Sequence, residues 1–171
     1  MRALLVVDML VDFIDPGGAL YIGEVAENLV VEVKKRLEEF RSAGDTIIFI
    51  CDRHLEDDAE FEMFPPHSLE NSGGDRVVDQ LAPKPSERVI TKRRFSAFFG
   101  TDLDLTLREK GIAELEIVGC VTNICILYTS ADARALNYRV TVPHQAVAGF
   151  DQDAHKFALQ ELKKTLGVNL T

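Results

Sequence analysis

The chain of 171 residues is long enough to bury a substantial hydrophobic core and short enough to form one domain. Its residues are 46% hydrophobic and 27% charged, which is typical of globular proteins that fold in water. The formal net charge of −9 argues against nucleic acid and anionic membrane surfaces as main partners, because both are themselves negatively charged.

The sequence shows neither a membrane-spanning nor an export segment. No apolar run is long enough to cross a bilayer, and the run that follows Arg2 stops too soon for a secretory signal. The cysteines Cys51, Cys120 and Cys125 are odd in number, which fits free thiols in a reducing compartment. We therefore expect a cytoplasmic protein that forms a single domain over residues 1–171.

Strand and helix patterns alternate along the chain. In order, they predict a strand over residues 3–7, a loop over 12–23, a helix over 26–43, a strand over 46–51 and a polar loop over 53–74. The second half predicts a short helix over 75–81, a strand over 88–91, a helix over 102–110, a strand over 115–118, a helix from about 125 to 136, a strand over 139–142, a helix over 152–166 and a strand over 168–170.

This alternation predicts an α/β fold, namely a three-layer α/β/α sandwich around a mainly parallel, Rossmann-like sheet of six strands. In such sheets, ligands bind beyond the carboxyl ends of the strands, where the strand order switches. Asp8, Asp52 and Lys92 each stand at the end of a predicted strand, and Cys125 stands just beyond another. We therefore expect these four side chains to converge at one edge of the sheet.

A thiol, a carboxylate and a lysine form a coherent nucleophilic set. Cys125 lies in an elbow between a strand and a helix, where a helix N-terminus favours a thiolate. Asp8 could take the thiol proton and return it to a leaving group, and Lys92 could hold Asp8 by its charge. Taken singly, Cys125 could be a buried core thiol, Asp8 a turn cap and Lys92 a solvated surface residue. Their joint placement favours catalysis.

The loop after the second predicted strand carries candidate metal ligands. Asp52 and His54 are two residues apart, so both can point the same way, and His67 follows a stiff pair of prolines. One carboxylate and two imidazoles suit Zn²⁺, Fe²⁺, Mn²⁺ or Co²⁺. The alternative is that this acidic loop is simply solvated.

Four stretches give the chain a family resemblance: LLVVDMLVDF at 4–13, KRRFSAFFGTDL at 92–103, GCVTNIC at 119–125 and QAVA at 145–148. With these stretches, the chain resembles the isochorismatase-like cysteine hydrolases and, among them, the nicotinamidases. The resemblance implies a catalytic triad of Asp8, Lys92 and Cys125 and a cis peptide at Cys120–Val121. It also implies an oxyanion hole formed by the N–H groups of Val121 and Cys125. Asn123 departs from the family pattern, which commonly has Asp there, but the triad is intact.

The resemblance also implies a fourth metal ligand between His54 and His67. Glu60 matches the relatives that use glutamate, but the loop is shorter here, which leaves Asp57, Asp58 and Glu62 as alternatives. A divalent metal, Zn²⁺ first and Fe²⁺ or Mn²⁺ otherwise, would then hold the pyridine nitrogen of the substrate. Aromatic walls for that flat ring would come from Phe13, Phe64 and Phe95, whose alternative role is core packing.

Together these features predict a nicotinamidase, which converts the small amide nicotinamide to nicotinate and ammonia through a thioester on Cys125. One alternative is another C–N hydrolase of the same superfamily, of the N-carbamoylsarcosine or ureido type, which lacks the metal ligands. A second alternative is a non-catalytic metal-binding module on the same fold. An isochorismatase is disfavoured because such enzymes can lack the cysteine. The resemblance further implies a homo-oligomer, a dimer or larger.

Overall fold

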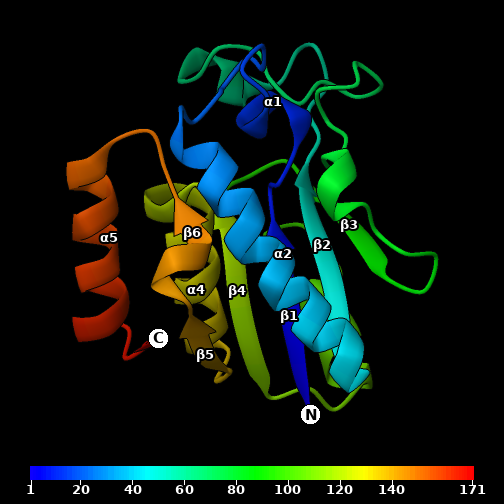
Figure 1. Cartoon of the computed structure of the whole chain (residues 1–171), viewed down its shortest axis with the longest axis vertical. Helices are drawn as coiled ribbons and strands as arrows, with labels where there is room; N and C mark the ends of the chain where they lie inside the picture. Colours follow the sequence, from blue (N-terminus) through cyan, green and yellow to red (C-terminus); the bar gives the residue numbers. More distant parts are fainter.

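A single parallel sheet organises the chain in this computed structural model, which describes residues 1–171. The strands follow the order β3-β2-β1-β4-β5-β7, and β6 pairs with β4 beside this path (Figure 1). Every strand pair is parallel. The strands are β1 (Arg2–Val7), β2 (Thr46–Asp52), β3 (Arg88–Lys92), β4 (Glu114–Cys120), β5 (Arg139–Val142), β6 (Val147–Ala148) and β7 (Asn169–Leu170). The predicted α/β fold with a parallel sheet is thus confirmed, in the strand order of a Rossmann-like fold.

Strand β1 shows why a fully apolar run makes a central strand. Side chains alternate between the two faces of a sheet, so a strand covered on both faces has to be apolar at every position. Ala3, Leu5 and Val7 join one hydrophobic core, and Leu4 and Val6 join the other. All five are at most 1% exposed, so β1 lies at the centre of the molecule.

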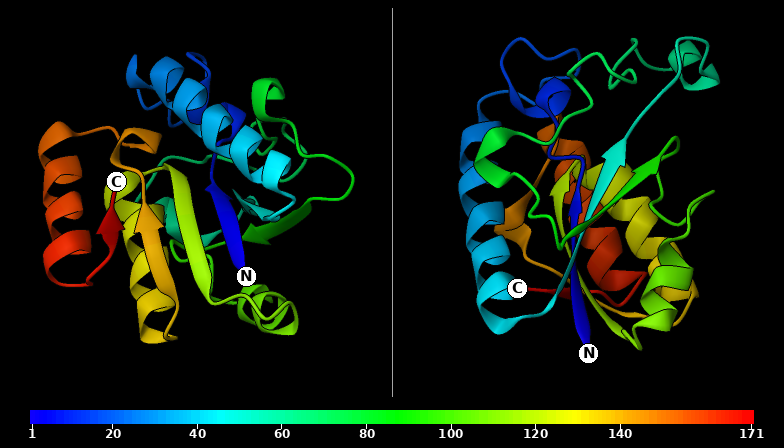
Figure 2. Two further views of the ribbon diagram at one scale, coloured as in Figure 1. Left: turned by 60° about the horizontal axis from the view of Figure 1, so that its bottom comes forward. Right: turned by 90° about the vertical axis from the view of Figure 1, so that its right-hand side faces the viewer.

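Helices cover both faces of the sheet. The long α2 (Val25–Ala43) packs on one face, and α3 (Leu103–Glu109), α4 (Leu127–Ala135) and α5 (Gln152–Lys164) pack on the other (Figure 2, right). In α2 the buried residues recur every three or four positions, as on one face of a helix, and they are Ala26, Leu29, Val33, Leu37 and Phe40. No helix combines the length and apolar character needed to cross a membrane.

Three sequence-based expectations about elements were wrong. The sheet has seven strands and not six, because the two-residue β6 pairs with β4 at Gly119 and is too short to leave a periodic signal. The predicted loop over 12–23 begins inside a short helix, α1 (Val11–Ile14). The predicted helix over 75–81 reduces to the 3-10 turn η2 (Asp79–Leu81), because Val77 instead pairs antiparallel with Leu10.

The switch in strand order falls between β1 and β4. From β1 the chain next forms β2 and then β3 on one side, whereas β4, β5 and β7 extend the sheet on the other side. Asp8 follows β1 directly and has a φ of 50°, a left-handed conformation that is uncommon for a residue with a side chain. The chain beyond β1 and β2, including α1 and the loop over 53–74, lies above their carboxyl ends (Figure 1). The fold therefore creates its candidate site at this edge.

Gly119 near the end of β4 is a position that only glycine can fill. Its φ is 116°, and a Cβ built there would lie 2.0 Å from the carbonyl oxygen of Val7. Gly119→Ala should therefore lower the free energy of unfolding by about 3 kcal/mol or more, measured by urea denaturation. The matched control is Gly17→Ala, where no heavy atom lies within 4 Å of the new Cβ and a change within about 0.5 kcal/mol is expected. Equal stability of the two variants would contradict this account of the elbow.

Candidate active site

Lys92 lies at the centre of a buried group of charged side chains. Its ammonium Nζ is 2.9 Å from Asp8 Oδ2 and 3.3 Å from Cys125 Sγ, and it also donates a hydrogen bond to Asp52 Oδ1. These four side chains are at most 4% exposed and come from the ends of β1, β2 and β3 and from the elbow after β4. The structure thus brings together Asp8, Lys92 and Cys125, as the sequence led us to expect.

The pKa values of the two carboxylates beside Lys92 are shifted in opposite directions. Burial and the nearby charge of Asp52 raise the pKa of Asp8 to about 6, although Lys92 acts in the opposite direction. Burial also acts to raise the pKa of Asp52, but Lys92, His54 and His67 outweigh it and hold this pKa well below the usual range. Asp52 is therefore a permanent anion, whereas Asp8 can gain and lose a proton near neutral pH.

Lys92 itself remains charged. Burial alone would lower the pKa of its ammonium, but Asp52, Asp8 and Cys125 raise it well above the ordinary value. A buried ammonium is tolerated because the carboxylates surround it, in line with the general need to pair charges that leave water.

The buried surroundings of Cys125 oppose the thiolate form that a helix N-terminus would favour. Cys125 lies inside the π-helix η3 (Thr122–Ile126), which leads directly into α4 at Leu127. Burial raises the pKa of the Cys125 thiol well above its ordinary value, and although Lys92 lowers it, Asp8 and Asp52 raise it further. The thiol therefore needs a base close by, and the reactive atoms of Asp8, Asp52 and Cys125 lie within 4.8 Å of one another.

The elbow before Cys125 has the backbone form that the resemblance implied. The peptide bond between Cys120 and Val121 is cis. Val121 and Cys125 are both buried, and both line the same cavity. The oxyanion hole assigned to their N–H groups stays a prediction.

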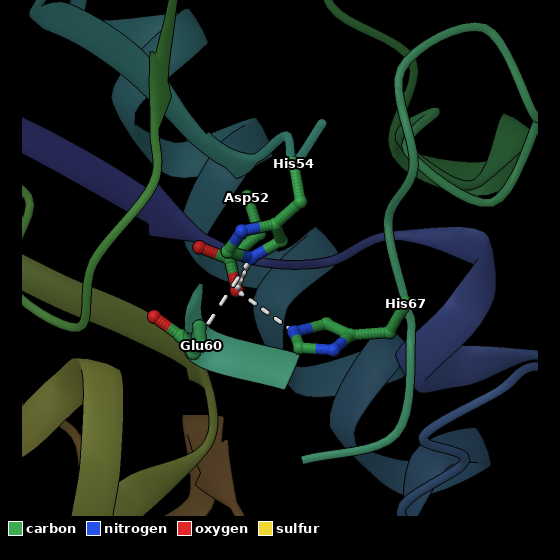
Figure 3. Close-up of side chains that lie close together, drawn as sticks. All are labelled: Asp52, His54, Glu60 and His67. Carbon is green, nitrogen blue, oxygen red and sulfur yellow. Dashed lines mark ion pairs between the residues drawn. The ribbon is translucent and has the colours of Figure 1, made fainter. Parts of the chain in front are cut away.

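The four candidate metal ligands form a second buried group, which shares Asp52 with the first. The side chains of Asp52, His54, Glu60 and His67 point toward one another (Figure 3). Asp52 Oδ2 lies 3.8 Å from His54 Nε2 and 3.7 Å from His67 Nε2, and His54 Nε2 lies 4.0 Å from Glu60 Oε1. The structure thus gathers all four residues that the sequence singled out. Among the alternatives to Glu60, Asp57 and Glu62 are exposed, and Asp58 lies behind His54.

The donor atoms of this group fit a divalent cation. The Nδ1–H of His67 donates to the carbonyl oxygen of Pro65 at 2.9 Å, which leaves a lone pair on Nε2. Buried polar atoms normally have hydrogen-bond partners, but His54 Nε2 and Glu60 Oε2 have none. Two imidazole nitrogens and two carboxylates around one point would be satisfied by a metal ion such as Zn²⁺.

One aromatic cavity connects the thiol to the candidate metal group. Its walls include Asp52, Glu60 and His67 as well as Cys125. All three predicted aromatic residues, Phe13, Phe64 and Phe95, line it. Phe13 lies edge-on to His67 with ring centroids 5.7 Å apart, and Phe64 is nearly perpendicular to Phe95 at 6.1 Å. A flat ring placed here would lie between the thiol and the metal ligands.

Sequence reasoning missed several residues of this site. The cavity is also lined by Leu20, Ile124 and Phe150, which come from three separate segments and share no pattern. Asp58 was considered only as a ligand, although it supports His54. Ile124 alone had a local signal, since it precedes Cys125 in the elbow.

Comparison with known proteins decides the family. The family model for the isochorismatase domain matches residues 2–171. The chain belongs to the isochorismatase family. The uncharacterized isochorismatase family protein PncA of Bacillus subtilis is 35% identical over an alignment of 179 positions, which covers 99% of this chain and 98% of the relative. The ureidoacrylate amidohydrolase RutB of Stutzerimonas stutzeri is 30% identical over 92% of this chain and 75% of the relative.

Solved structures of the isochorismatase family resemble this one closely. The nicotinamidase PncA from Bacillus subtilis matches with a TM-score of 0.94 and 33% identity, over 99% of this chain and 98% of the other. The pyrazinamidase of Pyrococcus horikoshii in complex with zinc matches with a TM-score of 0.93 and 30% identity, over 99% and 98%. The chain is thus an isochorismatase-family amidohydrolase.

The position of Cys125 in the cavity wall predicts selective chemistry. A small alkylating reagent can reach Cys125 through the cavity, whereas Cys51 and Cys120 are buried in the sheet and do not line it. Under native conditions we expect iodoacetamide to modify Cys125 several-fold faster than the other two, measured by peptide mass mapping over time. In urea all three thiols should react at similar rates. Equal rates in the native protein would contradict the placement of Cys125.

Proposed function

We propose that the protein is a nicotinamidase, which hydrolyses nicotinamide to nicotinate and ammonia through a thioester on Cys125. The observation that carries this proposal is the shared cavity, in which a thiol with an adjacent base faces a group of metal-ligand type across aromatic walls. The similarity to two structures of nicotinamidase and pyrazinamidase type supports it.

The first half of the reaction acylates the thiol. Asp8 takes the proton from Cys125 Sγ, and the sulfur attacks the carbonyl carbon of the carboxamide, so that a C–S bond forms and the oxygen becomes an oxyanion. We propose that the N–H groups of Val121 and Cys125 receive that oxyanion. Asp8 then returns the proton to the amide nitrogen, the C–N bond breaks, and ammonia leaves. The positive charge of Lys92, 3.3 Å from Sγ, stabilises the sulfur anion while it exists.

The second half releases the acid. Asp8, again ionised, takes a proton from a water molecule, which attacks the thioester carbon. The C–S bond breaks, Asp8 gives its proton to the sulfur, and nicotinate leaves. Asp8 thus acts twice as a base and twice as an acid, which requires a pKa near neutrality, and its raised value of about 6 suits that role.

The other end of the cavity would orient the substrate ring. We propose that Asp52, His54, Glu60 and His67 hold a divalent metal, which when bound would offer an open coordination position to the pyridine nitrogen. Phe13, Phe64 and Phe95 would hold the ring by its faces and edges. A ring fixed at both ends keeps the carboxamide next to Sγ, and such positioning is a large part of catalysis.

A substrate comparison tests this proposal. In Zn²⁺-loaded protein we expect nicotinamide to be hydrolysed, with kcat/KM for benzamide lower by at least about 100-fold, because benzamide lacks the ring nitrogen. Treatment with a chelator should remove most of this preference. The measurement is ammonia release over a range of substrate concentrations. Cys125→Ala should lower kcat by about 10⁴-fold while the fold survives, because the thiol is the proposed nucleophile.

The ureido-type alternative receives support from the 30% identity to RutB, and the same assay distinguishes it. Turnover of a ureido or N-carbamoyl substrate without turnover of nicotinamide would replace the nicotinamidase assignment with that alternative. Equal kcat/KM for nicotinamide and benzamide would show that the pyridine nitrogen does not contribute to substrate binding. Full activity of Cys125→Ala would move the nucleophile away from the thiol.

A further inference from the structure

A carboxylate without a role in the reaction lies directly behind the metal group. The side chain of Asp58 is fully buried, and its Oδ2 is 3.0 Å from His54 Nδ1. Oδ2 also accepts a hydrogen bond from Arg93 Nε at 2.8 Å. Oδ1 accepts from Arg94 Nη1 at 2.9 Å and from the backbone N–H of Glu60 at 3.0 Å. Asp58 therefore has four partners, which is about the number that a carboxylate can accept.

The two arginines make this buried carboxylate stable as an anion. Burial alone would raise the pKa of Asp58, but the N–H of Glu60, His54 and the two guanidinium groups lower it. Arg93 and Arg94 follow Lys92 directly at the end of β3, so one short stretch serves both Asp58 and the catalytic group. Asp58 consequently ties the loop over 53–74 to the end of β3.

The contact with His54 determines which imidazole nitrogen can bind a metal. A carboxylate only accepts hydrogen bonds, so Nδ1 of His54 carries a proton, and in the neutral imidazole the lone pair is then on Nε2. That Nε2 is the atom that faces Asp52 and Glu60 and has no hydrogen-bond partner. The other tautomer would direct an N–H at the metal position and could not bind there.

Asp58 also positions Glu60. It is the N-cap of the 3-10 helix η1 (Ala59–Glu62), in which Glu60 is the second residue. The N-cap hydrogen bond to the N–H of Glu60 fixes the start of that helix, so the carboxylate of Glu60 faces the metal group. Two of the four candidate ligands thus depend on one side chain, whereas His67 is oriented independently by the carbonyl oxygen of Pro65.

We propose that Asp58, held by Arg93 and Arg94, is the positioning residue of the metal group: it fixes His54 as an Nε2 ligand and places Glu60 beside it. It therefore sets how tightly the site binds a divalent cation. This inference rests on the proposed function for the presence of the metal, but it concerns metal affinity and not amide turnover. Carboxylates behind metal-binding histidines typically change affinity by 10- to 100-fold when removed.

Zn²⁺ binding to the full-length protein tests the proposal directly. We expect Asp58→Asn to weaken Zn²⁺ binding by about 10- to 100-fold, measured by isothermal titration calorimetry against a competing chelator. The matched control is Asp57→Asn, which removes the same charge from the adjacent, exposed residue and should leave the affinity unchanged. His67→Ala removes a proposed ligand itself and should weaken binding at least as much.

Two further measurements separate positioning from loss of the fold. The Co²⁺-loaded protein should show a changed visible absorption spectrum in Asp58→Asn and an unchanged one in Asp57→Asn. Thermal unfolding in chelator reports whether the metal-free variant still folds. If Asp58→Asn does not fold, Arg93→Gln is the substitute variant, since Arg93 is half exposed on its side chain and also holds Oδ2. It should weaken Zn²⁺ binding in the same direction by several-fold.

Each outcome has one meaning. Unchanged Zn²⁺ affinity in a folded Asp58→Asn, or in Arg93→Gln where that substitute is needed, overturns the role of Asp58 while leaving the nicotinamidase proposal in place. Equal weakening in Asp58→Asn and Asp57→Asn would show a general charge effect and overturn it too. Unaltered protein that takes up no Zn²⁺ overturns both this inference and the metal part of the proposed function. If Asp58→Asn weakens Zn²⁺ binding but the unaltered protein does not hydrolyse nicotinamide, the positioning role of Asp58 is supported and only the assignment of nicotinamide as substrate is refuted.

Discussion

The site depends on the ion pairs that the buried ammonium of Lys92 forms with Asp8 and Asp52. A positive charge without water is costly unless anions surround it, and here Asp8 and Asp52 supply them at the ends of β1 and β2. The parallel sheet makes this meeting possible, because neighbouring strands end at the same edge. Removing the lysine would leave the carboxylates of Asp8 and Asp52 facing each other. Lys92 is therefore needed both for the stability of this edge of the sheet and for the proposed reaction.

Asp52 connects the two halves of the site through its two oxygens. Oδ1 accepts from Lys92, and Oδ2 faces the imidazoles of His54 and His67. Because the pKa of Asp52 is held well below its usual range, Asp52 is a weak base, and in the proposed reaction the thiol proton goes to Asp8. The metal group and the nucleophilic group therefore have Asp52 in common, although their proposed roles differ. The aromatic cavity extends from one group to the other.

The buried parallel strands and the grouping of charged residues at their ends could be predicted from the sequence. Fully apolar runs such as residues 3–7 indicate buried parallel strands, and charged residues at their ends must share one edge of the sheet. Features that depend on contacts between distant segments could not be predicted. The pairing of Val77 with Leu10 replaced an expected helix, and the position of Phe150 in the cavity follows from the packing of the segment after β6. In the sequence Asp58 is one of three alternatives to Glu60 as a ligand, and only the fold brings it against His54, Arg93 and Arg94.

In the proposed reaction, the Cys125 thiol becomes acylated during turnover. Rapid acid quenching of the protein mixed with nicotinamide, followed by peptide mass spectrometry, tests it most directly. We expect a nicotinoyl group on the peptide that contains Cys125, present early and lost as the substrate is consumed. Ammonia release with that peptide unmodified at every quench time would show that Cys125 is not the nucleophile.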